Sequence, residues 1–124
     1  MAKIMLVDDA VFMRMMLKEI LNGAGYSRIL ETRTSGEAIN MLKVERPDVV
    51  FLDVTMPDTD GIEALTKMKD YNPDTKIIMC SSMGQEEVVK ECFEKGADDF
   101  IVKPFKPERI IESVSQFVEP DEQV

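Results

Sequence analysis

The 124-residue sequence contains no histidine. This absence excludes a catalytic triad built on histidine, a zinc site with histidine ligands, and phosphorylation of this chain on histidine. The sequence has only two cysteines, Cys80 and Cys92, and they form no CxxC motif. We interpret both as reduced, buried thiols with no redox or metal-binding role.

Long apolar runs and an excess of basic residues are also missing. No stretch approaches the roughly 18 apolar residues that a membrane-spanning helix needs, and the first residues lack the cleavage site of a signal peptide. Acidic residues outnumber basic ones by 24 to 15, which gives a formal net charge of −9 and argues against non-specific nucleic-acid binding. We therefore expect a cytoplasmic monomer that binds neither nucleic acid nor membrane.

The chain does contain a regular alternation of short apolar segments and amphipathic ones. The apolar segments predict strands at 3–7, 28–32, 48–52, 76–80 and 99–102, of which the more polar second one is expected near an edge. The amphipathic segments predict helices at 11–22, from 35 until before Pro47, and at 61–69, 85–95 and 107–118. Such alternation favours one α/β domain, a doubly wound parallel sheet with helices on both faces. We expect this domain to cover 1–119, and 120–124 to be a short, frayed acidic tail.

Four of the five predicted strands end in residues that can support chemistry. Asp8 and Asp9 end the first strand, Asp53 the third, Ser81 the fourth and Lys103 the fifth. In an open parallel sheet these ends share one edge, where ligands bind. Three adjacent carboxylates raise one another's pKa unless a cation lies among them, and an oxygen-only cluster suits Mg²⁺. The spacing therefore predicts a magnesium site with room for a phosphoryl group.

A carboxylate at such a site can act as a nucleophile toward phosphorus. Phosphoryl transfer to Asp53 would replace one negative charge by about two. Lys103 could pair with the added charge, and Ser81 could donate a hydrogen bond to a phosphoryl oxygen. In-line transfer requires positioning and charge neutralisation more than acid–base chemistry, so a site without histidine is sufficient.

Each of these residues also has a structural explanation when it is considered alone. Asp9 could be an N-cap of the first helix and nothing more, Asp53 could form an Asx turn, and Ser81 could cap a helix. Lys103 could be an ordinary solvated lysine. Their joint placement at four strand ends favours a functional site over coincidence.

At these spacings the sequence resembles the receiver domains of response regulators in two-component signalling, most of all the stand-alone chemotaxis regulators. The matching motifs are 7–9, 51–57 with Gly61, Ser81, and 102–105. The resemblance covers essentially the whole chain. It implies a flavodoxin-like fold with five helices around a five-stranded parallel sheet in the order 2-1-3-4-5.

The resemblance also assigns roles to the strand-end residues. It implies that Asp53 accepts a phosphoryl group from a histidine kinase of the CheA type. Mg²⁺ would be bound by Asp9, Asp53 and the backbone carbonyl of Thr55, with Asp8 acting mainly through a water. Lys103 would contact the phosphoryl group and would precede a cis proline bond.

Two further positions would form the switch. The resemblance implies that Ser81 moves to bind a phosphoryl oxygen and that Phe100 then turns inward. Tyrosine is frequent at the position of Phe100, so switching here would depend on packing and not on a hydroxyl. Thr55 and Met83 occupy the variable positions that set phosphoryl lifetime. Neither has a carboxylate or amide to orient a water, so we predict slow to moderate self-dephosphorylation.

The resemblance implies output through protein contacts, and not turnover of a separate substrate. The expected partner is a flagellar or archaellar motor switch or adaptor protein, which would contact a face made by 86–95, Phe100 and 106–116. Phe12, Met15 and Met83 are expected to be exposed near the site. They are either scattered apolar residues or a docking surface for a phosphatase or a kinase.

Two other functions remain open. A single-domain receiver could pass its phosphoryl group to a second histidine protein in a phosphorelay, and would then use the surface around Phe12 and Met15. A phosphatase of the haloacid dehalogenase type also uses a strand-end aspartate and Mg²⁺. Its motif requires a second aspartate two residues after the nucleophile, where this sequence has Thr55.

Overall fold

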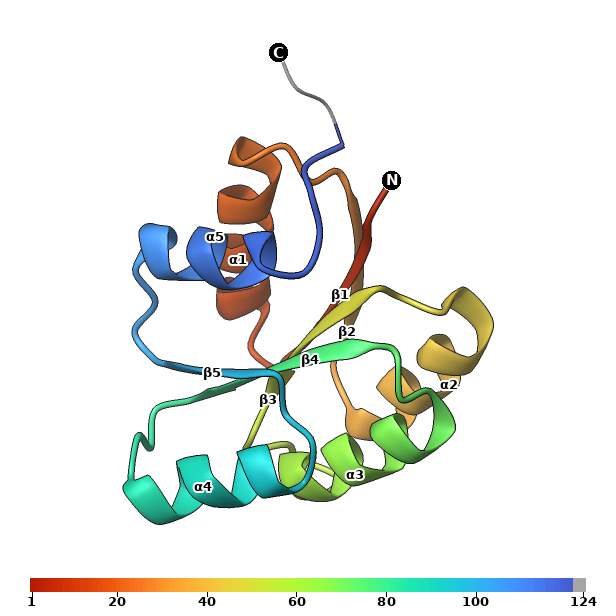
Figure 1. The fold of residues 1–124 in the computed structure, drawn as a ribbon, viewed down its shortest axis with the longest axis vertical. Coiled ribbons are helices and arrows are strands. Elements are labelled where there is room, and N and C mark those ends of the chain that lie inside the picture. The colour runs from red at the N-terminus through yellow and green to blue at the C-terminus, as the bar shows by residue number, and fades with distance from the viewer. Residues whose placement is uncertain (122–124) are drawn as a thin grey trace.

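The computed structural model describes residues 1–121 and contains a parallel sheet of five strands in the order β2-β1-β3-β4-β5 (Figure 1). The strands are β1 (Lys3–Val7), β2 (Arg28–Thr32), β3 (Val49–Asp53), β4 (Lys76–Ser81) and β5 (Asp99–Val102). The helices are α1 (Val11–Gly23), α2 (Ser35–Glu45), α3 (Gly61–Tyr71), α4 (Glu86–Glu94) and α5 (Pro107–Ser115). The predicted fold class, strand order and element sequence are confirmed.

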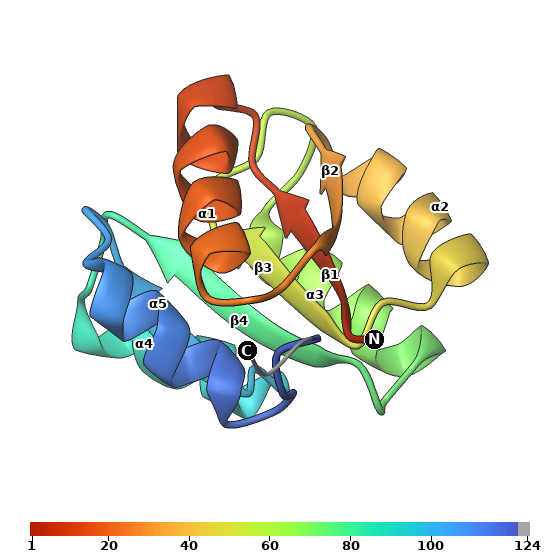
Figure 2. The same ribbon diagram turned by 90° about the horizontal axis from the view of Figure 1, so that it is seen from above.

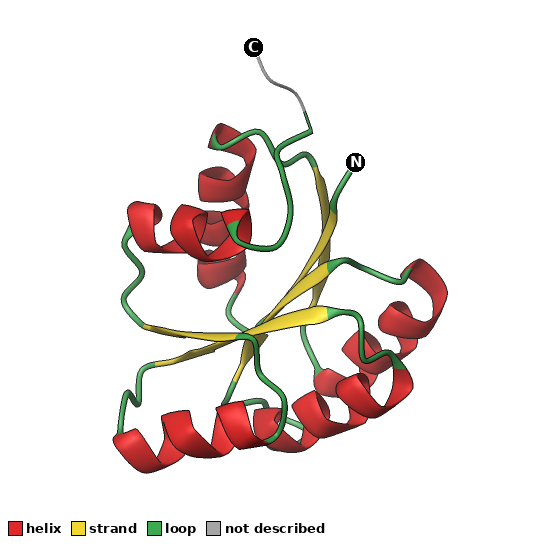
Figure 3. Ribbon diagram, viewed as in Figure 1, coloured by secondary structure: helices red, strands yellow, loops and turns green. Residues whose placement is uncertain are grey.

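Helices cover both faces of the sheet. Helices α1 and α5 lie on one face, and α2, α3 and α4 lie on the other (Figures 1 and 3). Figure 2 views the molecule from the side of α1 and α5. Because successive side chains of a strand point to opposite faces, Ile4 and Leu6 pack toward α1 and α5, whereas Met5 and Val7 pack toward α2 and α3.

The degree of burial of each strand follows its position in the sheet. All five residues of β3 are buried. The apolar run 49–52 predicts this for a strand covered on both faces, and Asp53 at the strand end is buried as well. Strand β2 is half exposed and lies at the edge, as its polar composition predicted. Within the described residues, no helix has the length and apolar character to cross a bilayer.

The start of α1 differs from the prediction. The residue at the N-cap is Ala10, which has no capping side chain, so a capping role for Asp9 is wrong. The preceding carboxylate, Asp8, accepts a hydrogen bond from the Ala10 amide at 2.9 Å instead. The buried residues of α1 are Arg14, Leu17 and Leu21, while Met13 and Met16 are partly buried against the apolar cluster that contains Leu17 and Leu21.

The C-terminal region also differs from the prediction. Helix α5 ends at Ser115 and not at Val118. The Asp121 carboxylate accepts hydrogen bonds from the amides of Ala2 and Ser27, at 3.2 and 2.9 Å, and from the Ser27 hydroxyl at 2.6 Å. The expectation of a frayed tail is therefore wrong at Asp121, and residues 122–124 lie outside the described part of the chain.

Candidate functional site

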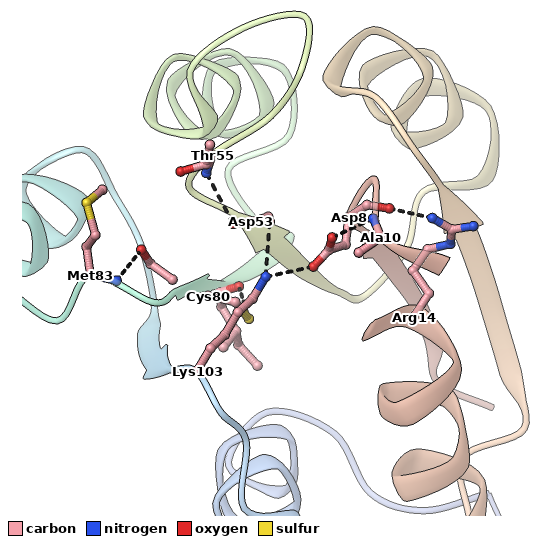
Figure 4. A network of polar contacts seen from close by, with 10 residues as sticks. Asp8, Ala10, Arg14, Asp53, Thr55, Cys80, Met83 and Lys103 are labelled. Carbon is pink, nitrogen blue, oxygen red and sulfur yellow. Dashed lines mark hydrogen bonds and ion pairs between the residues drawn. The ribbon is translucent and has the colours of Figure 1, made fainter. Parts of the chain in front are cut away.

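Three strand ends bring opposite charges together at the C-terminal edge of the sheet. The Lys103 ammonium, after β5, lies 2.9 Å from Asp8 Oδ2 and 3.1 Å from Asp53 Oδ2 (Figure 4). Asp8 and Asp53 are buried, whereas Asp9 is exposed. One oxygen from each of these three aspartates lies within 4.8 Å of the others. The predicted convergence is therefore confirmed for Asp8, Asp9, Asp53 and Lys103.

The aspartate cluster has the composition of a magnesium site. Three carboxylates face one ammonium, so the local charge is negative, and Mg²⁺ prefers oxygen ligands. Within residues 1–121, no hydrogen bond or ion pair engages the Asp9 carboxylate, so its oxygens are available to a cation. Asp8, Asp9 and Asp53 therefore fit a bound Mg²⁺.

The two oxygens of Asp53 have different partners. Oδ1 accepts a hydrogen bond from the Thr55 amide at 3.1 Å, and Oδ2 contacts Lys103. Asp53 thus does form an Asx turn, but this turn also brings the Thr55 backbone beside the cluster (Figure 4). A hydrogen bond of 2.7 Å from the Gly61 amide to the Val54 carbonyl closes the loop behind it.

Burial and charge set the titration of the central ion pair. Burial raises the pKa of Asp53, and this effect outweighs the lowering by Lys103 and by the Thr55 amide. Burial lowers the pKa of Lys103, but its hydrogen bond to Asp8 and the nearby carboxylate charges raise that pKa overall. A cation among the carboxylates would favour the ionised form of Asp53, which is the nucleophilic form.

Ser81 and Phe100 lie on the neighbouring strands β4 and β5. Ser81 is buried at the end of β4, and its hydroxyl oxygen accepts a hydrogen bond from the Met83 amide at 3.0 Å. It caps no helix, because the N-cap of α4 is Gln85. Phe100 is only 8% exposed and belongs to the apolar cluster on the α2, α3 and α4 face of the sheet.

The bond that links Lys103 to Pro104 is cis, as the resemblance implied. Both cysteines are buried and free, as expected. Phe12, Met15 and Met83 are exposed by 70, 61 and 43% of their surfaces, which confirms their expected exposure.

The sequence analysis missed one charged neighbour of the cluster, Arg14. Its side chain is buried, and its Nη1 donates a hydrogen bond to the Asp8 carbonyl oxygen at 2.5 Å (Figure 4). A signal was present, because Arg14 shares the spacing of the buried residues Leu17 and Leu21. A charged residue on the apolar face of a helix needs partners, and here they are the Glu31 carboxylate on β2 and the backbone carbonyl of Asp8 in the site.

Comparisons with known proteins agree with this geometry. Residues 4–115 match the family described as the response regulator receiver domain. The chain is 46% identical over 114 residues to chemotaxis protein CheY of Thermotoga maritima, an alignment that covers 92% of this chain and 95% of the relative. It is 42% identical over 116 residues to CheY of Halobacterium salinarum, and this alignment covers 93% and 96% of the two chains.

A solved structure is also similar. The CheX–CheY–BeF3–Mg complex of Borrelia burgdorferi contains a chain that matches with a TM-score of 0.89 and 36% sequence identity. The match covers 95% of this chain and 90% of the other.

Proposed function

Because this chain belongs to the response regulator receiver family, we propose that it is a signalling switch controlled by Mg²⁺-dependent phosphorylation of Asp53. The observation that carries the proposal is the cluster at the C-terminal edge of the sheet. There, Lys103 lies between Asp8 and Asp53, and the oxygens of Asp9 complete an acidic site.

The residues of the cluster divide the work of phosphoryl transfer. Asp53 supplies the attacking carboxylate oxygen, and Asp8 and Asp9, with Asp53, would hold Mg²⁺. Bound there, Mg²⁺ would supply positive charge to the phosphoryl oxygens during transfer. Lys103 is positioned to exchange its contact with Asp53 for one with the phosphoryl group. The acyl phosphate adds about one negative charge, and Lys103 neutralises part of it.

Phosphorylation of Asp53 would change the protein surface through its effects on Ser81 and Phe100. The Ser81 hydroxyl could leave the Met83 amide and donate to a phosphoryl oxygen, which would move the loop before α4. Phe100 is already buried in the cluster beneath α4, so we propose that phosphorylation stabilises this inward packing. A local charge change would thereby bias a two-state surface.

The proposed output face consists of α4, β5 and α5. Phe93 on α4 and Val102 on β5 are exposed apolar side chains of these elements. We propose that this face binds a motor switch or adaptor protein in chemotaxis, and that the phosphoryl donor is a cytoplasmic histidine kinase of the CheA type. The chemotaxis relatives support this pathway over others.

A phosphorelay is the second candidate, and one observation favours it. Val11, Phe12 and Met15 are exposed by 56, 70 and 61% on the first turns of α1, which begins two residues after Asp9. An apolar patch beside the phosphorylation site could dock a histidine-containing phosphotransfer protein or a phosphatase. Replacing Phe12 and Met15 by serine should slow phosphoryl exchange with such a protein and leave binding to a motor protein unchanged.

Intact mass spectrometry after incubation with Mg²⁺ and acetyl phosphate tests the proposal. The unmodified chain should gain one phosphoryl group, the gain should disappear with EDTA, and Asp53→Asn should gain none. The side-chain amide of this variant cannot form an acyl phosphate but keeps the shape of the carboxylate. No gain in the unmodified chain would exclude the phosphoryl switch, and a gain that persists in Asp53→Asn would place the acceptor elsewhere. The decay of the phosphorylated mass measures the predicted slow to moderate self-dephosphorylation.

A further inference from the structure

Arg14 is a buried cation for which the phosphoryl chemistry provides no role. Its residue is 7% exposed, and no other arginine or lysine among residues 1–121 is classed as buried. Burial of an arginine is unfavourable unless its donors are bonded. The position of Arg14 on the buried face of α1 therefore needs an explanation from its contacts.

The guanidinium joins two neighbouring strands. Nη1 donates to the Asp8 carbonyl oxygen at 2.5 Å, at the end of β1, as Figure 4 shows. Nε donates to Glu31 Oε1 at 3.1 Å, on β2. Glu31 also faces a second cation, Lys18, at 3.5 Å, so Arg14 is not its only counter-charge.

The contact with the Asp8 carbonyl restrains the peptide between Asp8 and Asp9. The carbonyl of Asp8 and the amide of Asp9 lie in one planar unit, so fixing the carbonyl oxygen also fixes the backbone from which the Asp9 side chain extends. The Asp8 carboxylate has its own restraints, from the Ala10 amide and from Lys103. The Asp9 carboxylate has no hydrogen bond within residues 1–121, so its direction depends on the backbone.

We infer that Arg14 is a positioning residue for the metal site, which holds the Asp8–Asp9 peptide so that both carboxylates reach one Mg²⁺. This inference rests on the proposed function. It assigns to Arg14 an effect on Mg²⁺ affinity through the backbone, and not through direct contact with the metal or the phosphoryl group.

The charge of Arg14 and its positioning role predict opposite changes in Mg²⁺ affinity when Arg14 is replaced. Removal of the Arg14 charge should strengthen Mg²⁺ binding, because it removes the Coulomb repulsion between the two cations. Release of the Asp8–Asp9 peptide should weaken it, because outer-shell contacts typically contribute a factor of about 10 to 100 to metal affinity. The direction of the change therefore distinguishes the two effects.

Isothermal titration of Mg²⁺ into the metal-free protein at fixed ionic strength measures this direction. We expect Arg14→Met to raise the Kd for Mg²⁺ about tenfold. Lys18→Met is the matched control, since it removes the same charge from the same helix and the same Glu31, without a contact to Asp8. Its Kd should change by about twofold or less, because Lys18 is exposed. Arg14→Lys keeps the charge but loses the planar pair of donors, and should give an intermediate Kd.

A second readout follows the backbone directly. In the metal-free protein, the amide chemical shifts of Asp9 and Ala10 should change in Arg14→Met and stay unchanged in Lys18→Met. If Arg14→Met does not fold, as urea unfolding would reveal, Arg14→Lys decides the matter. An unchanged or lower Kd in the folded Arg14 variant would overturn the inference alone. Failure of the unmodified chain to bind Mg²⁺ would overturn the proposed metal site as well.

Discussion

The two edges of the sheet use the same residue types in opposite ways. At the N-terminal edge, Asp48 and Asp98 directly precede β3 and β5. The Asp48 carboxylate accepts a hydrogen bond from the Lys3 amide at 2.8 Å. The Asp98 carboxylate accepts from the Ile77 amide at 2.9 Å and from the Lys69 ammonium at 2.7 Å. Each carboxylate there bonds the start of a neighbouring strand, so this edge joins strands.

At the C-terminal edge, the carboxylates converge and do not bond separate partners. Asp8 and Asp53 share one ammonium, Lys103, and Asp9 has no hydrogen bond within residues 1–121. Burial also raises the pKa of Asp53, which shows that its charged form is disfavoured. The comparison indicates that the N-terminal edge contributes stability, whereas the C-terminal edge gives up stability to keep negative charge available for a cation.

The largest effect is expected from the loop behind Asp53. A Cβ on Gly61 would overlap the Asp53 carbonyl oxygen and lie 2.7 Å from Val54 Cα, and both are backbone atoms that cannot move aside cheaply. We expect Gly61→Ala to lower the free energy of unfolding by about 3 kcal/mol and to abolish acetyl phosphate uptake. Gly23→Ala is the control, because nothing lies within 4 Å of a Cβ there, and urea unfolding should show a change of roughly 1 kcal/mol or less. Equal effects of the two substitutions would contradict the close approach at Gly61.

The next effect tests the N-terminal edge. Asp98→Ala leaves the Ile77 amide and the partly buried Lys69 ammonium without their carboxylate partner. We expect a loss of about 1–3 kcal/mol in urea unfolding. The Kd for Mg²⁺ should stay unchanged, since Asp98 lies at the opposite edge from the aspartate cluster. A change in Mg²⁺ affinity would show that the two edges are not independent.

At the C-terminal edge, removal of a carboxylate should raise the stability of the metal-free protein, whereas Asp98→Ala should lower it. Asp9→Asn relieves repulsion with Asp8 and Asp53, so the metal-free protein should gain about 0.5 kcal/mol of stability. The same substitution removes a metal ligand, and Mg²⁺ affinity should fall by more than the roughly tenfold typical of outer-shell changes. Urea unfolding without metal and Mg²⁺ titration measure the two effects. A loss of metal-free stability would mean that Asp9 has a structural role.

The sequence predicted the fold and the cluster because both follow from local patterns. Asp53 and Lys103 stand where apolar runs end, and parallel strands bring those ends together whatever the details of packing. Arg14 was missed because Met13, Met16, Leu17 and Ile20 have helical spacing and form an apolar stripe. That stripe accounts for a buried face of α1 without Arg14. The rotation of α1 about its axis depends on the sheet beneath it, and the sequence of α1 does not specify it.

The Asp121 contacts could not be predicted for a different reason. They join the end of the chain to Ala2 and Ser27, at sequence separations of 119 and 94 residues. A polar residue in a short acidic segment has no periodicity, so only the folded arrangement identifies its partners. The capping role assigned to Asp9 failed because Asp8, one residue earlier, bonds the Ala10 amide.

The smallest expected effect concerns how stability depends on pH in the metal-free protein. Carboxylates at the two edges of the sheet should contribute to this dependence with opposite signs. Hydrogen bonds from Ser27 lower the pKa of Asp121, which lies near the start of β1 at the N-terminal edge. Its contribution to stability is therefore present above the unfolded pKa of about 3.8 and is lost as pH falls through the lower folded pKa. Burial raises the pKa of Asp53, so its folded form binds a proton more readily than its unfolded form. Its contribution becomes more favourable as pH falls through the folded pKa.

Urea unfolding between neutral and acid pH, without metal, separates these two contributions by variants of equal charge. Asp121→Asn should reduce the loss of stability below the ordinary aspartate pKa, and Asp53→Asn should remove a gain that develops on acidification. The two variants should therefore change the slope of stability against pH in opposite directions. Mg²⁺ should abolish the Asp53 contribution, because a bound cation favours the ionised carboxylate, and it should leave the Asp121 contribution unchanged. If both variants change the slope of stability against pH in the same direction, ionised Asp53 does not destabilise the metal-free fold.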